Sequence, residues 1–316
     1  MRLNNLFDVN YNREDRDYTP EEIANKISDF EGLITGYGCP TLSELVFEKA
    51  DCLRIIAHAA GSIKWVLSEN IVKHYIIPKG ICVCSANKAI AYNVAEATIG
   101  LMIMASRRLL DHILSVREKL SWRDSEIPWP STTLNGSTIG IVSASTVGRE
   151  VIRLLQPFDV RILVYDPYLS EWEAGRLNVE KTTLDDLFGR SDIVSIHTPL
   201  IKETTQMIGE RQLKLLHDGA ILINTSRGKI IDQKALLNEC MTGRIVVVLD
   251  VTDPEPLPID SPFRRLKNVI ITPHITGSGR YGYFKIGEMT LQALENYFAN
   301  REVENKVDLQ KYNMLG

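Results

Sequence analysis

Short apolar runs recur along the second half of the chain, and polar or amphipathic stretches separate them. The runs are rich in Ile and Val and do not alternate with polar residues, which is typical of strands buried on both faces of a sheet. Helix-like stretches separate most of the runs, so the pattern predicts a doubly wound α/β fold with parallel strands and right-handed crossovers. The predicted strands cover 138–142, 161–165, 192–197, 220–224, 245–250 and 269–273, and the predicted helices cover 146–158, 182–191, 209–217 and 232–243.

The first 92 residues show a weaker form of the same alternation, which predicts a second, smaller α/β unit. Thr19, Pro20 and Glu22 have the spacing of a capping box with proline in the first helical turn, so a helix is expected from 19 to 30. A final amphipathic segment, roughly 281–300, predicts a helix that packs back on this unit. Strand-length apolar runs cover 32–36, 53–58 and 81–85.

A largely apolar stretch at 93–119 predicts one long helix that needs cover on several sides. The segment 121–134 after it is predicted to be an irregular arm that packs on a partner chain. It carries Trp122, Pro128, Trp129 and Pro130.

Charge and composition exclude several classes of partner. Lys and Arg number 36 against 40 acids, for a net charge of −4, and the basic residues are scattered, so neither nucleic acid nor an anionic membrane is expected as a partner. No apolar stretch reads as a membrane span, and the opening residues lack the apolar core of a signal peptide. The five cysteines form no C-x-x-C pair, which favours free thiols, no metal site and a cytoplasmic protein.

The stretch TIGIVSASTVGREV, 138–151, reads as a strand, a tight turn and a helix start. A dinucleotide-binding protein carries G-x-G-x-x-G at such a place, but here the three positions are Ser143, Ser145 and Gly148. Serine at 143 is tolerable if its φ is negative and costly otherwise. Serine at 145 adds a hydroxyl that could donate to a phosphate oxygen. The loop is therefore either a cofactor site with altered affinity for the dinucleotide or a site that no longer binds it.

Chemistry-bearing residues follow the ends of the predicted strands. Because parallel strands present their carboxyl ends at one edge, we expect these residues to gather there. Each has an ordinary explanation alone, such as a turn, a surface charge or a core histidine, but together they favour a ligand site. They are Asp166, His197, Thr198, Pro199, Arg227, Glu255 and His274.

From about Leu53 onward the chain resembles the D-isomer-specific 2-hydroxyacid dehydrogenases. The resemblance rests on INTSRGKIID (223–232), LDVTDPEPLPIDSP (249–262), VIITPHITGS (269–278) and, more weakly, VSIHTPL (194–200). It implies NAD as cofactor, a homodimer formed through 93–135, and a Rossmann domain at 98–282 inserted into a flavodoxin-like substrate domain at 1–97 and 283–316. The polar opening MRLNNLFDVN departs from the family, so the substrate domain is expected to lack an edge strand or the sequence to begin late.

The resemblance also implies roles for individual residues. Arg227, Glu255 and His274 match the catalytic arginine, glutamate and histidine of the family. The loop 59–63 matches the one whose backbone N–H groups hold the substrate carboxylate, which assigns substrate binding to Gly61 and Ser62 beside Arg227. Cofactor contacts are assigned to Ser145, Thr146, Val147, Gly148, Asp166, His197, Thr198, Pro199, Thr225, Ser226, Asp250 and Gly277.

The chemistry of these side chains fits the reaction. Arg227 offers a forked donor to a carboxylate and a carbonyl, and His274 can exchange a proton with the substrate oxygen. Glu255 would hold the imidazole and favour its protonated form. Asp166 lies 23 residues after Ser143, where an acid accepts bonds from ribose hydroxyls, and its charge favours NAD over NADP.

Two other functions remain open from the sequence. A dinucleotide sensor or corepressor could use the same fold without catalysis, in which case Arg227 and His274 would be dispensable. A formate dehydrogenase would pair its histidine with glutamine, and Glu255 speaks against that. The substrate stays open: glyoxylate and hydroxypyruvate are generic candidates, and Lys64 and Arg54 near the substrate loop would suit a phosphorylated acid.

Overall fold

The computed structural model describes residues 2–127 and 131–314. The chain divides into two compact units, 1–90 with 278–316 and 91–277. The division expected from the sequence lies at 97/98 and 282/283. Of the predicted arm, Pro128, Trp129 and Pro130 lie outside the described residues.

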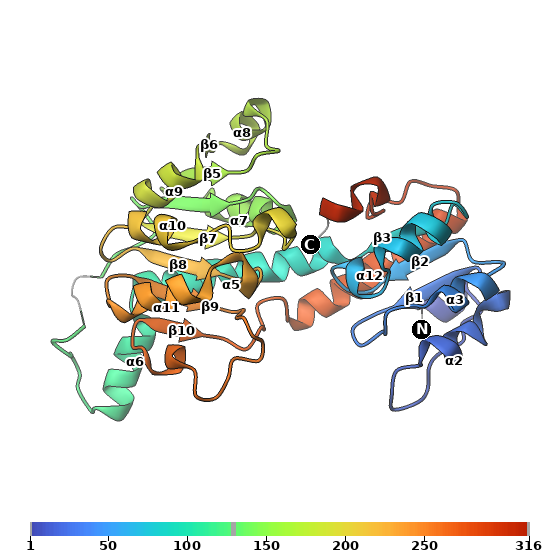
Figure 1. Cartoon of the computed structure of the whole chain (residues 1–316), viewed down its shortest axis with the longest axis horizontal. Coiled ribbons are helices and arrows are strands. Elements are labelled where there is room, and N and C mark those ends of the chain that lie inside the picture. The colour runs from blue at the N-terminus through green and yellow to red at the C-terminus, as the bar shows by residue number, and fades with distance from the viewer. Residues whose placement is uncertain (1, 128–130, 315–316) are drawn as a thin grey trace. The chain divides into compact units, whose positions relative to one another are not determined.

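The larger unit is built on a seven-stranded, fully parallel sheet with the order β10-β9-β8-β7-β4-β5-β6. All six predicted strands are present. Helices cover both faces of the sheet (Figure 1). The strands are β4 (Thr138–Val142), β5 (Arg161–Tyr165), β6 (Glu180–Lys181), β7 (Ile193–Ile196), β8 (Ile221–Asn224), β9 (Val246–Leu249) and β10 (Val269–Ile271); the helices are α7 (Thr146–Leu155), α8 (Glu171–Leu177), α9 (Leu184–Arg190), α10 (Glu210–Leu215) and α11 (Gln233–Met241).

Alternate side chains of the central strands enter two separate cores. Ile221 and Ile223 of β8 pack with α7 residues such as Val151, whereas Leu222 between them packs with Leu236 of α11. This two-sided burial explains why the strands read as continuous apolar runs.

The smaller unit contains a three-stranded parallel sheet with the order β1-β2-β3 among the described residues. Residues 2–6 form a helix rather than an opening strand, and Thr19 and Glu22 form the predicted capping box. That helix ends at Ala24, earlier than expected. The strands are β1 (Gly32–Thr35), β2 (Ile55–His58) and β3 (Cys82–Ser85), and the α-helices are α1 (Arg2–Leu6), α2 (Pro20–Ala24), α3 (Glu44–Lys49), α4 (Glu69–Ile71) and α12 (Arg280–Phe298).

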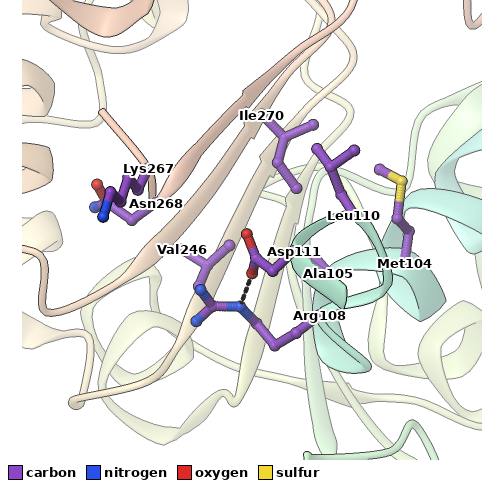
Figure 2. A pocket seen from close by; sticks show the side chains of 9 residues that line it. All are labelled: Met104, Ala105, Arg108, Leu110, Asp111, Val246, Lys267, Asn268 and Ile270. Atoms are coloured by element: carbon purple, nitrogen blue, oxygen red, sulfur yellow. Dashed lines mark hydrogen bonds and ion pairs between the residues drawn. The ribbon is translucent and has the colours of Figure 1, made fainter. Parts of the chain in front are cut away.

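The expected single helix at 93–119 is in fact two, α5 (Asn87–Ser106) and α6 (Leu109–Glu118). The break lies at Arg108, which is left-handed with φ 50°, and its Nε donates to Asp111 (Figure 2). Because neither glycine nor proline marks this point, the sequence pattern did not predict the break.

By length and composition α5 is apolar enough to cross a membrane, contrary to the expectation from the sequence. Its Ala95, Met102 and Ala105 are buried in the core of the larger unit. We therefore assign α5 as a core helix.

Candidate active site

The predicted site residues of the larger unit lie just beyond the carboxyl ends of its strands. β4 lies between β5 and β7, so the chain order reverses at β4. Ligands of such sheets bind beside this reversal. The residues of this edge are Ser143–Gly148, Asp166, His197–Pro199, Thr225–Arg227, Asp250–Glu255 and His274.

His274 and Glu255 form a direct pair. The imidazole Nδ1 lies 2.5 Å from Glu255 Oε1, and the side chains are 46% and 40% exposed. The two residues follow different strands, β10 and β9, that are neighbours in the sheet. With Nδ1 donating to the carboxylate, Nε2 is left for exchange with a bound molecule.

Asp250 fixes the loop that carries His274. Its buried carboxylate accepts bonds from the hydroxyl of Thr272 (2.6 Å) and the N–H of Ile275 (2.9 Å) on Oδ1. Oδ2 accepts from the N–H and the hydroxyl of Thr276, at 3.1 and 2.6 Å. Both oxygens are thus engaged within the protein, so Asp250, assigned above to cofactor contact, positions His274 in this structure.

His274 itself has a left-handed backbone, with φ 53°. Its N–H donates to the carbonyl of Asp250 at 2.9 Å. A non-glycine residue in this region costs about 1–2 kcal/mol. The bonds from the 272–276 loop to Asp250 hold the histidine in this unfavourable conformation.

Arg227 lies on a turn that Asn224 braces. The Asn224 amide donates to the carbonyl of Arg227 at 2.9 Å and accepts from the N–H of Ser226 at 3.0 Å. The next residue, Gly228, approaches the following loop so closely that a Cβ would lie 2.2 Å from the backbone of Thr252. This contact requires glycine and ties the Arg227 turn to the segment that leads to Glu255.

Arg227 interacts electrostatically with Glu255, the carboxylate that pairs with His274. Burial lowers the pKa of Arg227, and the charge of Glu255 raises it. A guanidinium remains protonated in either case. The edge therefore combines a permanent cation with a carboxylate–imidazole pair.

The loop after β4 has an unusual conformation at Ser143. Its φ is 80°, which is the case identified above as costly for serine. Gly148 fulfils the role of the third motif glycine, because a Cβ there would lie 2.1 Å from the carbonyl oxygen of Ser143. The start of α7 therefore approaches β4 closely, as a dinucleotide site requires.

Ser145 differs from the sequence expectation. Its hydroxyl donates to the carbonyl of His197 at 2.7 Å and accepts from the N–H of Gly148 at 3.3 Å. The hydroxyl expected to reach a phosphate is thus engaged as the cap of α7. The N–H groups of Thr146 and Val147, in the first turn of the helix, have no intrahelical acceptor and are suited to an anion.

Asp166 follows β5 and lies beside this loop. Its Oδ2 accepts from the hydroxyl of Ser143 (3.1 Å) and the N–H of Ala144 (2.9 Å). Its Oδ1 accepts from the N–H of Tyr168 at 2.8 Å. The acid is therefore part of the loop structure as well as a candidate ribose acceptor.

The remaining assigned residues have protein partners. His197 is buried with Nε2 2.9 Å from Ser195 Oγ, and burial lowers its pKa to about 3. The other contacts are Thr198 Oγ1 to the Val142 carbonyl, Thr204 Oγ1 to the Pro199 carbonyl, Thr225 Oγ1 with Thr98 Oγ1, Ser226 Oγ to the Thr198 carbonyl, and Asn93 Nδ2 to the Gly277 carbonyl. Asn93, Ser195 and Asn224 were given no role from the sequence, although Ser195 and Asn224 lie within the stretches 194–200 and 223–232 that carry the resemblance.

In the smaller unit, Gly61 and Ser62 follow β2, and the Ser62 hydroxyl accepts from the N–H of Lys64 at 3.4 Å. His58 is buried at the end of β2, with Nδ1 2.8 Å from Thr35 Oγ1. Arg54 pairs with Glu31.

Lys64 lies over the ring of Tyr312, with its Nζ 5.6 Å from the ring centroid. It and Arg54, suggested for a phosphorylated substrate, therefore both have other partners.

A known protein family matches the larger unit of this chain. The family profile described as "D-isomer specific 2-hydroxyacid dehydrogenase, NAD binding domain" matches residues 99–276. That range covers the whole seven-stranded sheet with its edge. The chain belongs to the D-isomer specific 2-hydroxyacid dehydrogenases. It is an oxidoreductase that uses a nicotinamide dinucleotide and transfers hydride between a 2-hydroxy acid and its 2-oxo form.

Individual relatives of this dehydrogenase extend the match beyond the NAD-binding domain. It is 33% identical over 297 residues to a glyoxylate reductase of Korarchaeum cryptofilum, covering 93% of this chain and 87% of the relative. It is 30% identical to a D-3-phosphoglycerate dehydrogenase of Archaeoglobus fulgidus, covering 92% of this chain but about half (53%) of the relative. The solved structure of the TT0316 protein from Thermus thermophilus has a TM-score of 0.75 at 28% identity, over 92% of this chain and 90% of that one.

Proposed function

We propose that this dehydrogenase reduces a small 2-oxo acid with NADH, using Arg227, Glu255 and His274. The observation that carries the proposal is the 2.5 Å contact between His274 and Glu255. Glyoxylate and hydroxypyruvate are the first candidate substrates, since relatives bear the names glyoxylate reductase and hydroxypyruvate reductase.

Arg227 would bind the substrate carboxylate and polarise its carbonyl. Its guanidinium presents several donors in one plane, which fixes the face of the carbonyl shown to the cofactor. The hydrogen bond from Asn224 to the carbonyl of Arg227 and the close packing of Gly228 fix the backbone at Arg227.

His274 would give its Nε2 proton to the substrate oxygen as the carbonyl is reduced, and take it back in the oxidation direction. Glu255 would hold the ring through Nδ1 and so leave Nε2 free for the substrate. The nicotinamide, when bound, supplies or accepts the hydride.

The cofactor would lie along the start of α7, with its pyrophosphate at the N–H groups of Thr146 and Val147. The absence of a Cβ at Gly148 lets the start of α7 lie close to the carbonyl of Ser143, as in a dinucleotide-binding turn. Asp166 would accept a bond from the adenosine ribose. A 2′-phosphate about 4 Å from this carboxylate would meet repulsion of about 4 kcal/mol at an effective dielectric of about 20, so NAD is preferred over NADP.

The test is NADH oxidation against a panel of 2-oxo acids, with Arg227→Ala and His274→Ala beside the natural protein. We expect turnover with at least one small 2-oxo acid and a loss of about 10²–10⁴-fold in both variants. Bound NADH without turnover across the panel would instead favour the sensor or corepressor.

We also propose a homodimer through the 93–135 segment, with a second copy of the chain as the partner. Leu109, Ile113 and Val116 form an exposed apolar stripe on α6, and Leu120 and Trp122 beyond it are more than four-fifths exposed. Exposed apolar side chains gathered along one segment are typical of an interface. Light scattering should show a dimer for the natural protein and a monomer for Ile113→Asp, while Met241→Asp, at an exposed site on α11, should remain dimeric.

The cytoplasm is the proposed location. All five cysteines are free thiols in the structure, which is typical of proteins from a reducing compartment. A fluorescent fusion that fractionates with membranes or the exterior would contradict this.

A further inference from the structure

Ser143 occupies a conformation that serine rarely adopts. Its φ of 80° would suit the glycine of the usual motif, and the added Cβ brings strain with it. A strained residue at a ligand site is a reason to ask what its side chain does there. Here the hydroxyl donates to Asp166 Oδ2 at 3.1 Å.

That bond changes what Asp166 can offer a ligand. A carboxylate has about four acceptor positions, two on each oxygen. Ser143 and the N–H of Ala144 take both positions of Oδ2, and the N–H of Tyr168 takes one of Oδ1. One position is left on Oδ1, whereas a ribose with two neighbouring hydroxyls can donate to both oxygens.

We propose that Ser143 sets the affinity for the dinucleotide by holding one acceptor position of Asp166. This rests on the proposed placement of the adenosine ribose at Asp166. The Ser143 hydroxyl competes with a ribose hydroxyl for Oδ2, so the protein binds NADH more weakly than the same loop without that hydroxyl. Ser143 is thus an affinity-determining residue that lies outside the catalytic triad.

The experiment measures the Kd of NADH by fluorescence titration, with no turnover involved. Ser143→Ala removes the hydroxyl and keeps the Cβ, so we expect NADH to bind about three- to tenfold more tightly, the equivalent of one hydrogen bond. Ser143→Gly should tighten binding to a similar degree and also raise the melting temperature, because it relieves the backbone strain. Ser137→Ala, before the start of β4, is the matched control and should leave the Kd unchanged.

A double-mutant cycle separates this inference from the proposed function. Asp166→Ala alone should weaken NADH binding, and in that background Ser143→Ala should have no further effect. If Asp166→Ala leaves the Kd unchanged, the ribose placement itself is wrong, and the inference falls with it. If Asp166→Ala weakens binding but Ser143→Ala does not strengthen it, or weakens it too, only the inference is overturned.

Discussion

His274 Nδ1 lies 2.5 Å from Glu255 Oε1, and the two residues come from loops after neighbouring strands of one sheet. The contact orients the imidazole so that Nε2 is left for the substrate. It also places a negative charge where a proton-carrying imidazole needs one. The pair is therefore the centre of the proposed mechanism, and Asp250 holds the loop that carries His274.

Replacing Glu255 with Gln keeps a hydrogen-bond acceptor but removes the negative charge beside the imidazole of His274. We expect kcat to fall about 10²-fold, while the Kd of NADH stays the same, since Glu255 does not touch the proposed dinucleotide loop. Steady-state kinetics together with fluorescence titration would measure both. An unchanged kcat would remove Glu255 from the mechanism.

Asp250→Asn should damage the loop that carries His274. The buried carboxylate accepts four bonds, and an amide would turn an NH₂ group toward at least one donor. The expected loss of unfolding free energy is about 1–3 kcal/mol, accompanied by a lower kcat. Urea unfolding would measure the loss of unfolding free energy. Asp260→Asn, at an exposed position, is the control and should have little effect on either.

Gly148→Ala tests the dinucleotide loop. The added methyl group would lie 2.1 Å from the carbonyl oxygen of Ser143, so the turn or the helix must move. We expect the Kd of NADH to rise about tenfold or more. Gly175→Ala, in α8 with no atom within 4 Å of the new methyl, should bind NADH normally and be slightly more stable. Equal affinity in both variants would contradict the placement of the pyrophosphate.

Because His197 is buried, we predict that the free energy of unfolding decreases in acid. Its pKa is about 3 in the folded protein, below the ordinary value of 6.5, so the unfolded chain binds the extra proton between these values. The contribution of His197 to the free energy of unfolding is therefore fully present above pH 6.5 and is lost as the pH drops toward 3. The slope of this contribution approaches about 1.4 kcal/mol per pH unit. Chemical denaturation at several pH values would measure the slope, and NMR should show a neutral His197 ring at about pH 5, between the two values. A protonated ring at that pH would refute the prediction.

Much of the fold was predictable because its strands are buried on both faces and therefore read as uninterrupted apolar runs. The helix α8 was missed although Ser170 and Glu173 form a capping box there. The strand β6 has only two residues, too few for a pattern. The break at Arg108 depends on a left-handed conformation that an arginine in the sequence does not indicate.

The candidate site was predictable to a different degree at each residue. Arg227, Glu255 and His274 could be named as candidates because they follow predicted strands, and their catalytic roles were implied by the family resemblance. The partners of Asp166 and Asp250 could not, since hydrogen bonds from loop N–H groups depend on backbone geometry. Ser143 has the same limit: the substitution is visible in the sequence, but only its φ of 80° and its bond to Asp166 reveal the consequence.

The proposed mechanism requires Arg227 and His274 to act on one carbonyl oxygen. A crystal structure with NADH and an unreactive 2-oxo acid analogue such as oxamate measures this directly. We predict that a guanidinium nitrogen of Arg227 and Nε2 of His274 both lie about 2.6–3.2 Å from the same oxygen of the analogue, with the carbonyl carbon facing the nicotinamide. An analogue bound beside nicotinamide with either side chain well outside hydrogen-bond reach would contradict the mechanism.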